Sequence, residues 1–140
     1  MPRNLLADQV WRQLSTLVID NKDTWRRAVV ERTGLAFSRV RILRRLAVRP
    51  MTVKQIAAAA GMDAPAATVA VTDLEQRGLV LRRVNPDNRR CKLVSLTDAG
   101  RQVVGLVEAV DDPAPASLAA FSEPELMALR DLMDRLATGN

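Results

Sequence analysis

The chain has 140 residues and is 48% hydrophobic, which suits one compact domain with a modest core. It contains no histidine and no tyrosine, so a Ser/His/Asp triad, a zinc site with histidine ligands and a catalytic tyrosine are excluded. The formal net charge of +5 is concentrated in residues 35–96, where twelve Lys and Arg stand against four Asp and Glu. Such a basic segment is typical of nucleic-acid binding, with a solvated surface as the alternative.

The first predicted element is one long amphipathic helix over residues 4–32, which contain neither proline nor glycine. Asn21 interrupts its apolar stripe, and Gly34 ends the helix. Trp11 and Trp25 lie fourteen residues apart on one face of this helix. They are expected to pack in a core or a dimer, with stacking on a small aromatic or phenolic effector as the alternative.

Three shorter helices are predicted next. The spacing of Phe37, Val40, Leu43 and Leu46 predicts a helix that stops before Arg49-Pro50. Thr52 and Gln55 form a capping box for a helix that ends at Gly61, and Asp63 caps a helix that runs to Gly78. Two helices joined at a glycine turn are typical of a helix-turn-helix, whose second helix enters the major groove of DNA.

A β-hairpin is expected after this pair of helices. Residues 79–84 and 91–96 are short strand-like runs, and the turn-forming segment Asn85-Pro86-Asp87-Asn88 joins them. Cations follow the turn, which indicates a wing that enters the minor groove or lies along phosphates, with Asp87 available to pair with Arg89. Arg82 and Arg83 are neighbours on a strand, so only one of them is expected to face DNA.

The C-terminal part predicts two more helices and a dimer. Thr97 caps a helix that Asp111-Asp112-Pro113-Ala114-Pro115 breaks, and Ser122 and Glu125 form a capping box for a last helix. The first and last helices both carry apolar stripes, which two subunits would bury by intertwining, whereas a monomer would pack the two helices on each other. The predicted dimerisation residues are Trp11, Leu14, Val18, Leu126, Leu129, Met133 and Leu136.

The segments TVKQIAAAAGM and LEQRGLVLRRVNPDNRRCKLVSLTDAG resemble the multiple antibiotic resistance regulator (MarR) family of bacterial transcription factors. The resemblance implies a mostly α fold with a small β-hairpin wing, in which residues 35–97 form the winged helix-turn-helix and residues 1–34 and 98–140 the dimerisation helices. It also implies a homodimeric repressor of a palindromic operator, released by a small ligand or by oxidation. Asp87 and Arg89 fall on the family's D-x-R wing pair, which would make Arg89 the minor-groove arginine.

The predicted DNA contacts fall into three sets. The recognition-helix set is Ala64, Pro65, Ala66, Thr68 and Thr72. The wing set is Arg82, Asp87, Arg89, Arg90 and Lys92. The phosphate set is Arg39, Arg49, Thr52 and Lys54. Because Ala64, Ala66 and Val69 replace residues that are often polar or basic in the family, base reading is expected to depend on Thr68, on thymine methyls and on groove shape.

Other functions stay open at this point. The alanine-rich recognition helix also fits a winged-helix protein-interaction module that has lost operator reading. A carboxylate-dependent enzyme is disfavoured, since no paired acids flank a pocket motif and no Gly-rich phosphate loop occurs. We expect no cofactor and no metal. Cys91 in the wing is expected to be an inert strand residue, with a redox sensor as the alternative.

The expected location is the cytoplasm. No apolar run approaches the roughly 20 residues that span a bilayer, so no membrane contact is expected. Asp8 and Arg12 stand where a signal peptide would need its apolar stretch. One cysteine also excludes an internal disulfide framework.

Overall fold

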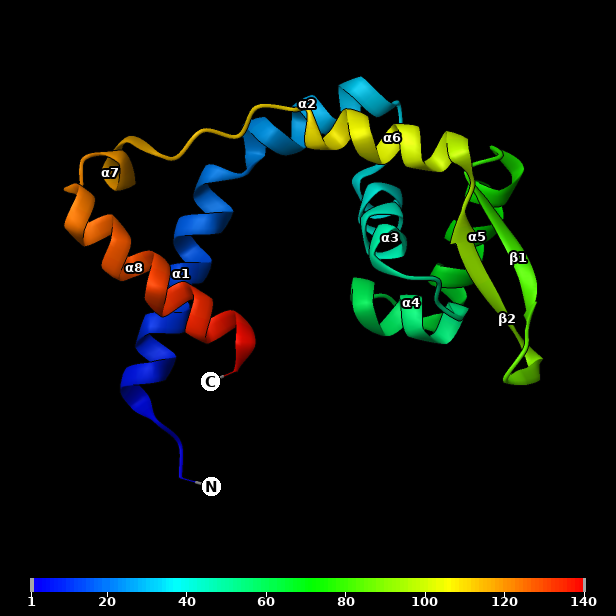
Figure 1. The fold of residues 1–140 in the computed structure, drawn as a ribbon, viewed down its shortest axis with the longest axis horizontal. Coiled ribbons are helices and arrows are strands. Elements are labelled where there is room, and N and C mark those ends of the chain that lie inside the picture. Colours follow the sequence, from blue (N-terminus) through cyan, green and yellow to red (C-terminus); the bar gives the residue numbers. More distant parts are fainter. Residues whose placement is uncertain (1, 140) are drawn as a thin grey trace.

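The computed structural model describes residues 2–139, which form eight helices and two strands. In chain order these are α1 (Leu5–Asn21), α2 (Asp23–Thr33), α3 (Phe37–Val48), α4 (Val53–Ala60), α5 (Ala64–Gln76), β1 (Val80–Asn85), β2 (Asn88–Leu96), α6 (Asp98–Glu108), α7 (Ala116–Ala119) and α8 (Glu123–Thr138). A body built from α2 to α6 and the hairpin lies at one end, and α1, α7 and α8 extend away from it as two arms (Figure 1). The predicted fold class, mostly α with a small hairpin, is confirmed.

The N-terminal segment is broken where one continuous helix was predicted. Helix α1 ends at Asn21, whose side-chain amide donates a hydrogen bond to the carbonyl of Leu17, 2.8 Å away. Asparagine competes for backbone groups in this way and is a poor residue for a helix interior. At the break, the ammonium of Lys22 pairs with Asp112 in the linker after α6 and lies 4.4 Å from the ring centre of Trp25. Trp11 and Trp25 therefore lie on different helices.

The helix-turn-helix forms as its capping residues predict. Thr52 Oγ1 accepts a hydrogen bond from the Gln55 amide at 3.2 Å, and Gln55 Oε1 accepts one from the Thr52 amide at 2.9 Å. Helix α4 ends at Gly61, whose φ of 67° is left-handed. Asp63 Oδ1 then accepts from the Ala66 amide at 2.7 Å and begins α5. Helix α5 is the recognition helix of this motif.

Strands β1 and β2 pair in antiparallel register, from Val80 opposite Leu96 to Val84 opposite Lys92. This hairpin, residues 80–96, is the wing. Both strands reach farther toward the tip than predicted, since β1 includes Asn85 and β2 begins at Asn88. At the base of the wing, Met51 exchanges backbone hydrogen bonds of 3.0 and 2.7 Å with Val94, which attaches the wing to the start of the helix-turn-helix.

The core lies inside the body and is formed by α2 to α6 and the inner residues of the wing. Its largest fully buried side chains are Ile42, Leu43, Ile56, Leu74, Val29, Val40, Val71 and Val94. Each such side chain stabilises the fold by about 1.5–3 kcal/mol relative to exposure. Helix α6 approaches the wing closely because Gly100 has no side chain: a Cβ there would lie 2.1 Å from the carbonyl oxygen of Leu79.

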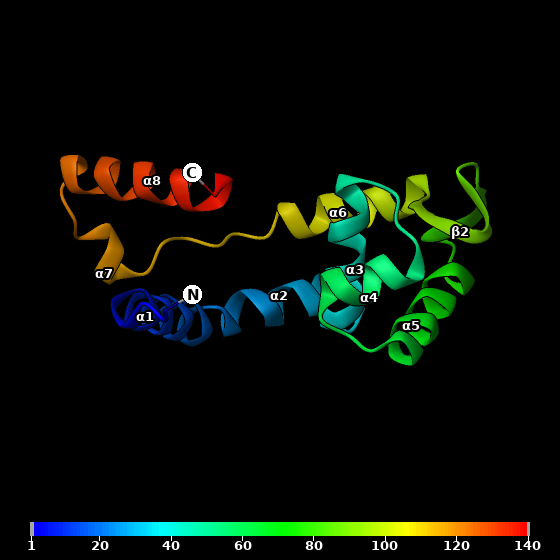
Figure 2. The same ribbon diagram turned by 90° about the horizontal axis from the view of Figure 1, so that it is seen from below.

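The arms leave their apolar stripes uncovered within one chain. No residue of α1 or α8 is buried, and 66% of Trp11 and 60% of Leu136 are exposed. Of the predicted dimerisation residues, Leu14, Leu126 and Leu129 are half-buried, while Val18 and Met133 are exposed. The two helices cross in the projection of Figure 1, but Figure 2 shows α8 and α1 well apart. The monomer packing considered as an alternative is therefore not adopted. The short helix α7 was not predicted.

Candidate nucleic-acid interface

The recognition helix presents a face with few polar groups. Ala67, Ala70, Val71 and Leu74 bury its inner side. On its outer side Ala64, Pro65, Thr68 and Val69 are exposed, and Ala66 is half-buried. The Thr68 hydroxyl donates to the carbonyl of Ala64 at 3.0 Å, so its proton is engaged, while its lone pairs can still accept. The predicted shortage of polar groups for base reading therefore holds for the exposed face of α5.

Two of the predicted DNA contacts bind each other instead of facing outward. Nη2 of Arg82 donates a hydrogen bond of 2.8 Å to Oγ1 of Thr72. Nε of Arg82 lies 3.6 Å from Oε1 of Glu75, one turn farther along α5. The Arg82 side chain is only 24% exposed, and Thr72 is half-buried. Glu75 was not singled out from the sequence, because no local spacing relates it to a residue on the hairpin.

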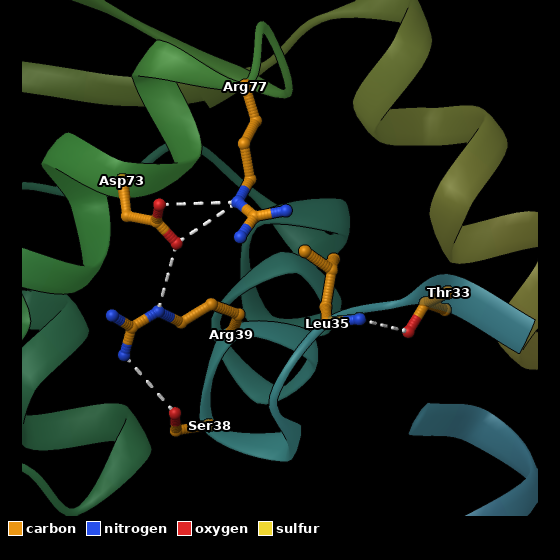
Figure 3. A network of polar contacts seen from close by, with 6 residues as sticks. All are labelled: Thr33, Leu35, Ser38, Arg39, Asp73 and Arg77. Atoms are coloured by element: carbon orange, nitrogen blue, oxygen red, sulfur yellow. Dashed lines mark hydrogen bonds and ion pairs between the residues drawn. The ribbon is translucent and has the colours of Figure 1, made fainter. Parts of the chain in front are cut away.

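Asp73 connects the recognition helix to α3 through an ion network (Figure 3). Its Oδ2 lies 3.4 Å from Nε of Arg39 on α3 and 3.2 Å from Nε of Arg77, the residue that follows α5. Partial burial opposes ionisation of Asp73, but the hydrogen bonds and charges of Arg77 and Arg39 outweigh it and hold the pKa of this carboxyl below its ordinary value. Arg39, predicted to contact phosphate, is 24% exposed and also donates to Ser38 Oγ at 3.4 Å.

The wing exposes four cations. Arg83, Arg89, Arg90 and Lys92 are all exposed, and none has an ion-pair partner among residues 2–139. The sequence placed Arg89 and Arg90 beyond the turn, whereas the structure places them within β2. Neither has a partner in the strand register, which shifts from Val84 opposite Lys92 to Asn85 opposite Asn88, so both lie in the irregular part of the wing near its tip.

The tip of the wing is held by asparagines and not by the expected Asp87–Arg89 pair. Oδ1 of Asn85 accepts from the Asp87 amide at 3.0 Å, and Oδ1 of Asn88 accepts from the Arg90 amide at 3.1 Å. In the described part of the chain no hydrogen bond or ion pair joins Asp87 to Arg89. Asparagine side chains commonly close turns in this way. Cys91 is half-buried in β2, with Asn88 Nδ2 3.6 Å from its sulfur.

The remaining phosphate candidates differ in how they are used. Arg49 and Lys54 are exposed and form no ion pair within the described residues. The Thr52 side chain is committed to the capping box of α4, and both Thr52 polar groups in that box are satisfied. Arg49 and Lys54 therefore have the charge and exposure that a phosphate contact requires, and Thr52 has a structural role.

Trp25 does not offer an open ring face. Its ring packs edge-to-face on Phe37, with centroids 5.6 Å apart, while Lys22 and Arg44 lie 4.4 and 5.3 Å from its centroid. Cations over an aromatic face occupy the surface that a planar ligand would need. Packing is thus the observed role of Trp25. Beside it, a hollow of about 340 Å³ is lined by Phe37, Arg41, Arg44, Arg45 and Val48.

The matching family model covers residues 37–92, which run from the start of α3 through the recognition helix into the wing, and its description is the MarR family. Residues 37–92 are therefore a MarR-family segment. This match agrees with the resemblance of the helix-turn-helix entry and the wing, the two segments that suggested it.

Solved structures share the layout of the whole chain, including its arms. A MarR-family transcriptional regulator from Rhodococcus sp. RHA1 has 24% identity and a TM-score of 0.67, with 99% of each chain covered. CouR from Rhodococcus jostii RHA1, bound to p-coumaroyl-CoA, has 25% identity and a TM-score of 0.65 over 96% of each chain. A variant of MepR from S. aureus, bound to an oligodeoxyribonucleotide, has 20% identity and a TM-score of 0.58 over 95% of this chain and 96% of that one.

Membrane spans and metal clusters are both absent from the described residues. No helix between Pro2 and Gly139 is long and apolar enough to cross a membrane. Over the same range, no group of three or more Cys, Asp or Glu side chains is arranged to hold a metal ion.

Proposed function

We propose that this MarR-family protein is a homodimeric transcriptional repressor that binds a palindromic operator in double-stranded DNA. The observation that carries the proposal is the set of four exposed cations without ion pairs on the wing, beside a recognition helix with an exposed face. Cations without protein partners can neutralise phosphates at little cost, because they break no ion pair on binding. The family match favours a regulator over the carboxylate enzyme considered from the sequence.

The two DNA-facing elements have different proposed roles. The exposed side of α5 contacts base edges in the major groove through Thr68 and, through Ala64 and Val69, the methyl groups of thymine. Arg89 and its neighbours on the wing reach the adjacent minor groove or its phosphates, where a narrow A·T-rich groove attracts arginine. The solved structure of a MepR variant bound to an oligodeoxyribonucleotide supports DNA as the partner of this fold.

Dimerisation is proposed from the uncovered stripes of the arms. Exposed apolar residues on α1 and α8 would be buried by a second copy, and two-fold symmetry would then place two recognition helices on one face of DNA. Half-sites about one helical turn apart, roughly 34–36 Å, fit such a dimer. The requirement for two copies explains why helices this exposed can stay folded.

Release by a small aromatic or phenolic ligand is also proposed. CouR was solved with p-coumaroyl-CoA bound, which supports a ligand with a phenolic group for this fold. In this chain the Trp25 ring already contacts Phe37, Lys22 and Arg44, so it does not supply a free stacking surface. Exposed Trp11 on α1 would report such a ligand by a change in its fluorescence.

A matched-charge titration tests DNA binding by the wing. Full-length protein is titrated against a fluorescent duplex of mixed sequence, about three helical turns long, at several salt concentrations. The double variant Arg89→Gln, Arg90→Gln should weaken binding by about 1–3 kcal/mol for each arginine that touches DNA and reduce the salt dependence. The control, Arg27→Gln with Arg32→Gln on α2, removes the same charge from exposed residues that lie outside the recognition helix and the wing. It should bind like wild type. Equally weakened binding in both variants would favour the protein-interaction alternative.

A further inference from the structure

The half-buried arginine of the wing has a geometry that direct DNA contact does not explain. Arg82 stands on β1 with its guanidinium turned toward α5, where it donates to Thr72 Oγ1 at 2.8 Å and lies 3.6 Å from Glu75 Oε1. Its side chain is 24% exposed, and its Nε is buried without a hydrogen-bond partner. A cation meant for phosphates would instead have its donors in solvent.

We propose that Arg82 is a positioning residue of the DNA-binding surface: it fixes the wing against the recognition helix and does not itself contact DNA. This inference rests on the proposed DNA-binding function. Thr72 accepts a hydrogen bond from Arg82, and Glu75 is the ion-pair partner of Arg82. We call the contact of these three side chains the joint. Thr72 therefore belongs to the joint and does not read bases.

The chemistry of the three side chains suits such a joint. Thr72 and Glu75 are three residues apart, and therefore lie on the same face of α5. The planar guanidinium has five donors in a fixed fork, so one arginine can engage both positions and restrain β1 along the helix and around it. A lysine, with a single point charge, could satisfy only part of this arrangement.

One donor of the joint, Nε of Arg82, is buried and has no hydrogen-bond partner. An unpaired buried N–H is costly, and Glu75 is the carboxylate that lies within ion-pair range of it in the described structure. The Glu75 side chain is 42% exposed, so it has room to move. A shift of a few tenths of an ångström would bring its oxygen within ordinary hydrogen-bond distance.

Arg83 supplies a natural comparison on the same strand. Adjacent residues of a strand point to opposite faces, and Arg83 is exposed, with no partner in the part of the chain that the structure describes. The two arginines thus separate the roles of β1: Arg82 faces the helix and sets geometry, whereas Arg83 faces solvent and can meet phosphate.

Positioning of the wing has a consequence for specificity. The recognition helix and the wing contact neighbouring segments of one half-site, so the offset between them determines which flank the wing reaches. If the joint were loose, the wing could shift to fit duplexes whose base pairs beside the half-site are altered. Removal of the Arg82 guanidinium should therefore reduce the affinity difference between the preferred duplex and a flank-altered duplex. The salt-dependent part of the affinity should change less.

The first experiment uses full-length protein without DNA. Amide hydrogen exchange of the wing is measured in Arg82→Gln, Thr72→Val and the double variant. Each single variant should speed exchange in β1 and β2 by about tenfold, as expected when one charged hydrogen bond is removed, and the double variant should add little. Thr72→Ser keeps the hydroxyl and should behave like wild type. Additive effects, or wing exchange that does not change, would overturn the joint. If Arg82→Gln does not fold, Thr72→Val against Thr72→Ser carries the test.

The second experiment uses the duplex that wild-type protein enriches most from a random-sequence pool. In Arg82→Gln and Thr72→Val the discrimination against a flank-altered duplex should fall about tenfold, with the slope of affinity against salt unchanged. Arg83→Gln should keep the discrimination and lower that slope by about 0.9 for each phosphate that Arg83 neutralises. A slope lowered equally by Arg82→Gln and Arg83→Gln would show that Arg82 contacts phosphate and would overturn the inference. If wild type enriches no duplex, the proposed function fails, and the hydrogen-exchange experiment alone decides whether the joint exists.

Discussion

Asp73 on the recognition helix accepts a hydrogen bond from Arg39 on α3, with Nε 3.4 Å from its Oδ2, and another from Arg77 at 3.2 Å. The carboxylate thereby joins the helix that carries the proposed base contacts to the helix that precedes the motif (Figure 3). This connection makes the placement of α5 sensitive to the charge of one side chain.

The charge of Asp73 predicts a pH dependence of stability. Its folded pKa lies below the ordinary 3.8, so its contribution is fully present above that value and is lost as the pH falls through the folded pKa. The difference in unfolding free energy between wild type and Asp73→Asn should be constant near neutral pH and shrink in acid. Urea unfolding at a series of pH values measures it, with exposed Asp111→Asn as the control. A difference that stays constant into strong acid would show that the network does not stabilise the fold.

A charge in the apolar stripe of α8 should disrupt the dimer. Leu129→Glu is expected to dissociate or unfold the protein, because an unpaired carboxylate would enter an apolar seam. Arg130→Glu places the same charge on the next residue, whose side chain is 66% exposed, and should remain dimeric. Sedimentation velocity at micromolar concentration distinguishes the two variants. Wild-type protein that sediments as a monomer would refute the proposed assembly.

Two glycines of α6 should respond to alanine in opposite directions. Gly100→Ala places a Cβ 2.1 Å from the backbone oxygen of Leu79, and should destabilise the protein by about 1–3 kcal/mol as α6 is forced from the wing. A Cβ on Gly105 would have no neighbouring atom within 4 Å, so Gly105→Ala should stabilise the helix by about 0.5–1 kcal/mol. Thermal unfolding of both variants gives the comparison. Equal and small effects would mean that the close approach at Gly100 is absent in solution.

The sequence was sufficient for the elements whose ends are encoded locally. Capping boxes at Thr52 and Ser122 and the left-handed glycines at Gly34 and Gly61 all formed as predicted. In each case the residue satisfies backbone groups within one turn of itself, so no distant part of the fold is needed to specify it. The break at Lys22 was missed although Asn21, a poor residue for a helix interior, lies directly before it. The contact of Lys22 with Asp112, ninety positions later, has no local signal.

The candidate site was predicted less completely, for the same physical reason. Exposed cations of the wing could be inferred, because charge density and a turn signal are visible in the sequence. The partners of partly buried groups could not. Arg82 and Thr72 were both assigned to DNA, and their contact with each other depends on how β1 docks on α5. The i,i+4 pair of Asp73 and Arg77 was the one part of the ion network that local spacing could have indicated.

Thymine methyl groups should contribute to operator affinity. The exposed face of α5 offers Ala64, Val69 and the methyl of Thr68, so replacing thymine by uracil in the half-sites should weaken binding while leaving every hydrogen-bonding edge intact. Thr68→Ala should cost about 1 kcal/mol, the ordinary value of one hydrogen bond. Quantitative gel shifts with matched duplexes measure both effects. Tolerance of uracil together with an inert Thr68→Ala would mean that α5 does not read DNA in this way.

The most direct test of the central claim, that two copies of this protein read DNA together, is selection from a random-sequence duplex pool by full-length protein, followed by sequencing. We expect enrichment of a two-fold symmetric sequence with half-site centres about one helical turn apart, near 34–36 Å, and with A·T-rich flanks under the wings. A pool without an enriched sequence, or an enriched sequence that lacks two-fold symmetry, would contradict the claim.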